Sequence, residues 1–157
     1  MPPGRRFDSQ TLELVGQHRL AGELLLAGLE VAFPARDRGV DLVAYADVDA
    51  GRFVARPIQL KAPSRRSFGV WKKYERIHDL VFAFVWHLDG ADPPETYALT
   101  QAEAVAVAGA MGWLATESWM LRGAYNTNNP GARLRGILAP YLMGADKWRE
   151  KIAGAPR

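Results

Sequence analysis

The nine residues Leu80–Leu88 (LVFAFVWHL) constrain the fold more than any other part of the chain. A strand with one face in water alternates apolar and polar residues, whereas a central strand that is covered on both faces is apolar throughout. This run is apolar except for His87. It therefore predicts a central strand, with helices on both sides of the sheet that contains it.

The sequence around this run predicts an α/β domain with a mixed central sheet flanked by helices. Asp8 or Ser9 is suited to cap a first helix, and Gly28 lies near its end, where a left-handed residue is often needed. Thr100-Gln101-Ala102-Glu103 has the pattern of a capping box. The expected elements are a helix over 9–28, strands over 29–33, 40–46, 52–61, 80–88 and 96–99, and a helix from Thr100 to about Met111.

Three local features refine these expectations. Leu14, Ala21 and Leu24 fall at helical spacing, so we expect them on one face of the first helix. Asp49-Ala50-Gly51 has the composition of a turn between two strands. Pro57 lies within a predicted strand, which implies a sheet edge, a bulge or a late start of that strand.

A length of 157 residues fits one domain better than two. We expect a core over 9–111 and a helical C-terminal extension over 112–157. The chain contains no cysteine, which excludes disulfides and thiolate metal sites and favours a reducing cytoplasm. No apolar run reaches the length of a membrane-spanning helix, and residues 1–7 lack the apolar region of a secretory signal.

The net charge is only +3, but it is unevenly distributed. Basic residues concentrate between Lys61 and Arg76 and again after Arg133, while the stretch 77–121 has acidic residues and neither lysine nor arginine. Such segregation can produce a basic face for a polyanion such as nucleic acid. Solvated loops and helices explain the same pattern equally well.

The candidate chemistry lies in Gly39-Val40-Asp41-Leu42-Val43 and in Pro57-Ile58-Gln59-Leu60-Lys61. Because side chains alternate along a strand, Gln59 and Lys61 point to the same face. If the two strands pair antiparallel, Asp41 lies beside both. A carboxylate, an amide oxygen and an ammonium would then surround one point, which is unusual for a sheet face that is only core.

The first helix followed by GLEVAFP, GVDLVAYA and IQLK resembles the PD-(D/E)XK nuclease superfamily. The similarity is greatest to small members related to Holliday-junction resolvases and to homing endonucleases with a QxK motif. It covers residues 9–62 and extends to the strand at 80–88. The resemblance implies a restriction-endonuclease-like fold, DNA as the substrate and a homodimer as one form of the molecule.

The resemblance also implies roles for individual residues. Asp41 would be the main ligand of Mg²⁺ or Mn²⁺, Gln59 a second ligand and the Leu60 backbone carbonyl a third, with Lys61 as the catalytic lysine. The family often has a glutamate 11 residues before the glycine that ends the first helix. Here that position is Gln17, so Gln17 or Glu13, one turn earlier, is a further candidate ligand.

Two glutamines, Gln17 and Gln59, thus stand where the family usually has carboxylates. They favour a second hypothesis, a nuclease-fold protein without catalysis that binds nucleic acid or a protein. A small-molecule or structural role is the third hypothesis, and no motif supports it. Under either of the first two, the basic residues after the motif are candidates for contacting nucleic acid: Arg65, Arg66, Lys72, Lys73 and Arg76.

Other conspicuous side chains have simpler explanations. Phe68, Trp71 and Tyr74 alternate with the basic residues and could stack on bases, but an ordered lid whose aromatic rings pack on the sheet explains them slightly better. The three histidines show no metal-ligand spacing. We expect Trp113, Trp119, Tyr141 and Trp148 to be core anchors.

Overall fold

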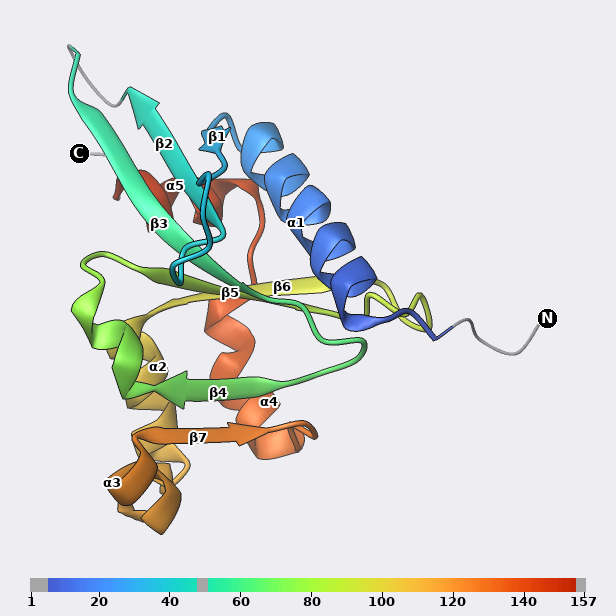
Figure 1. Ribbon diagram of the computed structural model, residues 1–157, viewed down its shortest axis with the longest axis vertical. Coiled ribbons are helices and arrows are strands. Elements are labelled where there is room, and N and C mark those ends of the chain that lie inside the picture. The colour runs from blue at the N-terminus through green and yellow to red at the C-terminus, as the bar shows by residue number, and fades with distance from the viewer. Residues whose placement is uncertain (1–5, 48–50, 155–157) are drawn as a thin grey trace.

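A mixed five-stranded sheet forms the centre of the protein (Figure 1), as seen in a computed structural model that describes residues 6–47 and 51–154. The predicted α/β architecture, one domain with a mixed sheet flanked by helices, is confirmed. β3 and β5 run parallel, and the other neighbouring strands are antiparallel. In their order across the sheet, the strands are β1 (Glu30–Ala32), β2 (Leu42–Asp47), β3 (Phe53–Lys61), β5 (Val81–Trp86) and β6 (Glu95–Thr100).

β5 is the buried strand that the apolar run predicted. It lies between β3 and β6, and all six of its side chains are fully buried. The strand is shorter than the run because His87 has a positive φ of 64°, which turns the chain out of the sheet.

Helix α1 (Ser9–Leu26) begins and ends at the predicted signals. The Asp8 carboxylate accepts a hydrogen bond from the Thr11 N–H at 2.7 Å. Gly28 has a φ of +79°, and Leu29 N–H donates to the Leu24 carbonyl, which closes the helix in a Schellman motif.

The prediction of which residues form the apolar face of α1 was partly wrong. Leu14 is 55% exposed, whereas the buried residues follow a four-residue spacing. The four are Leu12, Gly16, Leu20 and Leu24.

Helices cover both faces of the sheet (Figure 1). α1 and α5 (Ala145–Ala153) pack on one face in a core that includes Trp148. α2 (Gln101–Ala110) and α4 (Ala132–Leu138) pack on the other, where the aromatic side chains of β5 point. The capping box at Thr100 and Glu103 is present at the start of α2.

A second, two-stranded sheet was not predicted. It pairs β4 (Phe68–Trp71) with β7 (Ala124–Thr127) below the main sheet in Figure 1. Residues 112–157, which we expected to be helical, therefore contain β7 as well as α3 (Glu117–Arg122), α4, α5 and two short 3₁₀ turns. Four-residue strands with a partner more than fifty residues away leave little periodic signal in a sequence.

Pro57 lies in the edge portion of β3. Its partner on β2 is Val43, and pairing with β5 begins only at Ile58. The missing N–H therefore costs no ladder hydrogen bond to β5.

The turn expected at Asp49-Ala50-Gly51 lies mostly outside the described residues. Within the described part of the chain, no helix has both the length and the apolarity to cross a membrane.

Candidate functional site

The site forms where β2 begins beside the end of β3. Register pairs Leu42 with Ile58, yet the Ile58 carbonyl also accepts a hydrogen bond from the Asp41 N–H at 2.8 Å. Asp41 and Leu42 thus both lie opposite Ile58, as in a β-bulge. A bulge changes the direction of the first side chain, here that of Asp41. The Asp41 carboxylate accepts a hydrogen bond from the Leu60 N–H at 2.6 Å and so takes the place of a missing backbone partner.

The Gln59 side chain contacts the carbonyl of Leu60, the residue whose N–H is bonded to this carboxylate. The Gln59 side chain is 9% exposed, and its amide nitrogen donates to the Leu60 carbonyl at 3.3 Å. Its Oε1 is buried without a hydrogen-bond partner among the described residues. A buried oxygen of this kind is rare, and it indicates that a donor, a water or a cation belongs there.

Lys61 completes the cluster, because it shares the face of β3 to which Gln59 points. Its ammonium donates to the Tyr74 hydroxyl at 3.3 Å and lies 4.6 Å from the centre of the Trp71 ring. The structure thus joins Asp41 to the backbone of Leu60, between Gln59 and Lys61, and the Lys61 charge acts on it. The roles of the three side chains stay a prediction.

Helix α1 approaches the same point. The Gln17 amide donates to the Asp41 backbone carbonyl at 3.4 Å. Glu13, one turn earlier, is exposed, and its charge acts on Asp41. Gln17 thus contacts the backbone of Asp41, while Glu13 contributes charge.

The environment raises the pKa of Asp41 above its usual range. Burial is the main cause, and the negative charges of Asp37 and Glu13 add to it, whereas the Leu60 N–H and the Lys61 charge oppose it. The fold therefore disfavours the ionised carboxylate, and an added cation would offset that cost.

The five basic residues proposed to contact nucleic acid lie in different places. Arg65 pairs with Asp89 at 3.6 Å, and Arg66 donates to His87, so both belong to the loop beside the end of β5. Lys72 lies over the Trp119 ring and Lys73 over the Tyr74 ring. Arg76 approaches Gly39, in the loop that leads to Asp41.

The interleaved aromatic residues form a lid on the core. Phe68 is 1% exposed and Tyr74 6%, and both pack against β5. Trp113, Trp119 and Trp148 are also buried, as expected of core anchors. Tyr141 is only partly buried, at the rim of that core.

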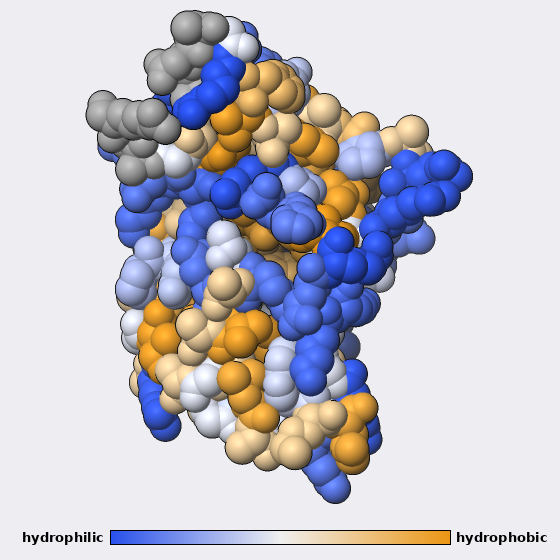
Figure 2. Space-filling view, turned by 90° about the vertical axis from the view of Figure 1, so that its left-hand side faces the viewer, coloured by the Kyte–Doolittle hydropathy of each residue, from blue (hydrophilic) through white to orange (hydrophobic). Residues whose placement is uncertain are grey.

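The face in Figure 2 carries a broad hydrophilic band between apolar patches.

Sequence reasoning missed three kinds of site residue. Tyr74 was expected in a lid or in stacking on bases, and its contact with Lys61 through the hydroxyl was not foreseen. Asp37 was not considered; it accepts a hydrogen bond from the Gly39 N–H and acts on Asp41. Arg36 and Arg38 are exposed in the same loop. The charged loop Arg36-Asp37-Arg38-Gly39 was a usable signal, because binding and catalytic residues occur disproportionately on loops.

The available oxygen donors suit a weakly held hard cation. Mg²⁺ prefers oxygen ligands and is commonly held by one or two carboxylates together with substrate phosphates. The Asp41 carboxylate, the Gln59 Oε1 and the Leu60 carbonyl are donors of this type. No group of three or more His, Cys, Asp or Glu side chains suited to a metal occurs in residues 6–47 and 51–154.

A separate surface cavity of about 410 Å³ lies away from this cluster. Its walls include Arg56, Glu103, Tyr141, Lys147 and Lys151, and none of the predicted catalytic residues. Lys151 and Glu103 already neutralise each other at 2.6 Å. We therefore place the candidate chemistry at Asp41 and its neighbours rather than in this cavity.

The chain matches no protein-family model, and no curated protein or solved structure is significantly similar to it. The resemblance to nucleases thus stays a prediction that rests on the motifs.

Proposed function

We propose that this protein is a metal-dependent nuclease that hydrolyses phosphodiester bonds in DNA. One observation supports the proposal above all others. The Asp41 carboxylate is bonded to Leu60, the residue between Gln59 and Lys61 at the end of β3, the Gln59 amide contacts the Leu60 carbonyl, and the Lys61 charge acts on Asp41. The mixed sheet with α1 across one face is compatible with a restriction-endonuclease-like fold.

The donor set fits Mg²⁺ or Mn²⁺, with Asp41, Gln59 and the Leu60 carbonyl as the residues that would hold it. Bound there, such a cation polarises the scissile phosphate and supplies an activated water. The unpartnered Gln59 Oε1 supports this fit. Since Asp41 would bring the single ligand carboxylate, we expect weak metal binding that strengthens when DNA phosphates complete the site.

The remaining roles belong to the protein's own side chains. Lys61 would offset the negative charge that grows on the phosphate in the transition state. The Gln17 hydrogen bond holds the Asp41 backbone in place. Arg36, Arg38, Lys73 and Arg76 are exposed bases suited to phosphates of the DNA backbone.

Cleavage of single-stranded, duplex and branched DNA in Mg²⁺ or Mn²⁺ tests the proposal. Lys61→Ala should lower the cleavage rate at least about 100-fold, as expected for loss of a charge that stabilises the transition state. Lys147→Ala on the exposed side of α5 is the matched control and should cleave normally. Equal rates for the two variants, or no cleavage of any substrate by the folded wild type, would contradict the proposal.

The second candidate function is nucleic-acid binding without catalysis. Gln59 favours it, because an amide brings no negative charge to a metal. Binding should then weaken steeply as salt increases, and Arg76→Gln should reduce the slope of log K against log salt by about 1. Salt-dependent binding without metal-dependent cleavage would support this candidate over the first.

A further inference from the structure

Lys61 is held by two aromatic side chains that the proposed reaction does not otherwise need. Its ammonium is 3.3 Å from the Tyr74 hydroxyl, 4.6 Å from the Trp71 ring centre and 5.4 Å from the Tyr74 ring centre. The two rings meet edge to face, with centres 6.2 Å apart. The ammonium therefore has a hydrogen-bond acceptor and two π-faces as neighbours, all of which favour a cation.

The two aromatic residues are themselves fixed by the core. Tyr74 packs edge to face on Phe82 of β5, with ring centres 5.2 Å apart, and is 6% exposed. The Trp71 carbonyl accepts a hydrogen bond from the side chain of Gln101 at the start of α2.

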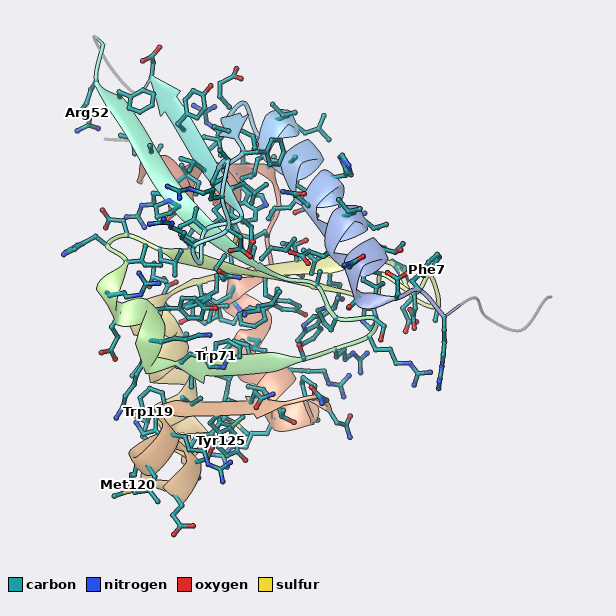
Figure 3. The ribbon with its side chains drawn as sticks, viewed as in Figure 1. Phe7, Arg52, Trp71, Trp119, Met120 and Tyr125 are labelled. Carbon is teal, nitrogen blue, oxygen red and sulfur yellow. The ribbon has the colours of Figure 1, made fainter. Side chains whose placement is uncertain are left out.

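The C-terminal part of the chain secures the same segment. The Lys72 N–H donates to the Gly123 carbonyl at 2.8 Å, and β4, which ends at Trp71, pairs with β7. Figure 3 labels Trp71 at the end of β4, with Trp119 and Tyr125 beside α3 and β7. The residues directly before Tyr74 are thus anchored by elements distant in the sequence.

A lysine side chain is long and flexible, and fixing it costs considerable rotamer entropy. We propose that Tyr74, together with Trp71, is a positioning residue that fixes the Lys61 ammonium at the end of β3, on the face of the strand to which Gln59 also points. The expected effect on DNA cleavage rests on the proposed nuclease function. The immobilisation of the Lys61 ammonium does not depend on that function. Tyr74 would act through Lys61 and would not itself touch the reacting phosphate.

Tyr74→Phe separates this role from simple core filling, because it keeps the buried ring and removes the hydroxyl. The loss of a hydrogen bond to a charged group should lower kcat for DNA cleavage about tenfold, with KM nearly unchanged. Tyr125→Phe is the matched control: its ring stacks on Trp113 at 4.4 Å, and the variant should retain wild-type kinetics.

A second readout does not depend on cleavage. In protein labelled with ¹⁵N-lysine, a held ammonium exchanges its protons slowly and gives a resolved ¹H–¹⁵N signal, which Lys61→Arg would assign. We expect this signal in the wild type and in Tyr125→Phe, and its broadening or loss in Tyr74→Phe.

The outcomes separate the two proposals. An unchanged kcat in Tyr74→Phe of an active enzyme, a missing wild-type Lys61 signal, or a signal that Tyr74→Phe leaves intact would each overturn the positioning role. A wild type that does not cleave DNA, but whose Lys61 signal depends on the Tyr74 hydroxyl, would support the positioning role and refute the nuclease.

Discussion

Asp41 is hydrogen-bonded to the sheet and also carries the carboxylate of the candidate site. Its N–H, its carbonyl and its carboxylate all have partners, namely Ile58, Gln17 and Leu60. A bulge before a regular strand gives one residue this many constraints. The fold therefore keeps a carboxylate in a place that raises its pKa, and shifted pKa values cluster at functional sites.

Asp41→Asn should raise the free energy of unfolding at neutral pH. A raised carboxylate pKa in the folded state means that stability is greatest below the ordinary aspartate pKa and falls as pH rises through the higher folded value. The neutral amide avoids that loss and can still accept the Leu60 hydrogen bond. Urea unfolding at several pH values should show the advantage of the variant shrinking as pH falls through this range.

Metal provides the complementary test of Asp41. If the site binds Mg²⁺ or Mn²⁺, either cation should stabilise the wild type and not Asp41→Asn. Asp47→Asn, an exposed position on the same strand, controls for the substitution itself. A variant that is destabilised by the same amount at every pH would contradict the expected dependence on ionisation of Asp41.

At the scale of elements, the contact between α1 and β3 fixes the site. A Cβ at Gly16 would lie 2.7 Å from the Ala62 Cβ, 3.3 Å from Leu88 Cδ1 and 3.5 Å from Leu60 Cδ2. The missing side chain thus lets the helix lie directly on the end of β3. The same approach brings Gln17 to the backbone of Asp41.

Gly16→Ala and Gly22→Ala should have opposite effects, although both lie in the same helix. Alanine favours a helix interior over glycine by about 1 kcal/mol, and nothing lies within 4 Å of a Cβ at Gly22, so Gly22→Ala should stabilise. At Gly16 the overlap with Ala62 should outweigh that gain and cost about 1–3 kcal/mol. Urea denaturation measures both.

The contact also couples stability to activity. Because Leu60 and Ala62 flank Lys61, Gly16→Ala should also reduce cleavage, whereas Gly22→Ala should not. Equal stabilisation by the two variants would show that α1 can move away from the sheet at no cost.

At the scale of the whole molecule, the sheet is shared by two cores. The core under α1 and α5 includes Val81, Ala83 and Val85 of β5, and the core under α2 and α4 includes Phe82 and Phe84 of the same strand. Because β5 contributes alternate residues to both cores, neither core can form unless β5 is in place. We therefore expect one cooperative unfolding transition.

Trp148→Ala tests this dependence from the far end of the chain. Trp148 is 1% exposed, and its indole N–H donates to the Glu23 carboxylate of α1 at 3.2 Å. Its loss should reduce the free energy of unfolding by about 3–5 kcal/mol. Tryptophan fluorescence and circular dichroism should still report coincident transitions. Two separated transitions would show that α5 and its core fold independently of the rest.

Much of the fold could be predicted because its signals are local. The cap at Asp8, the left-handed Gly28, the capping box at Thr100 and the apolar β5 each depend on residues within one element. The exposed Leu14 and the strands β4 and β7 could not be predicted in this way. They depend on where a helix or strand meets its neighbours, and periodicity alone does not encode that orientation.

The sequence by itself determined which residues could meet at the site. The alternation of side chains along β3 puts Gln59 and Lys61 on one face, and antiparallel pairing with β2 brings Asp41, the residue before β2, to the end of β3. The tertiary structure alone decided how they are held: the bulge at Asp41, the Gln17 contact and the two rings around Lys61. Alternation is a property of any extended backbone, whereas these contacts join segments whose positions are fixed only when the complete core packs.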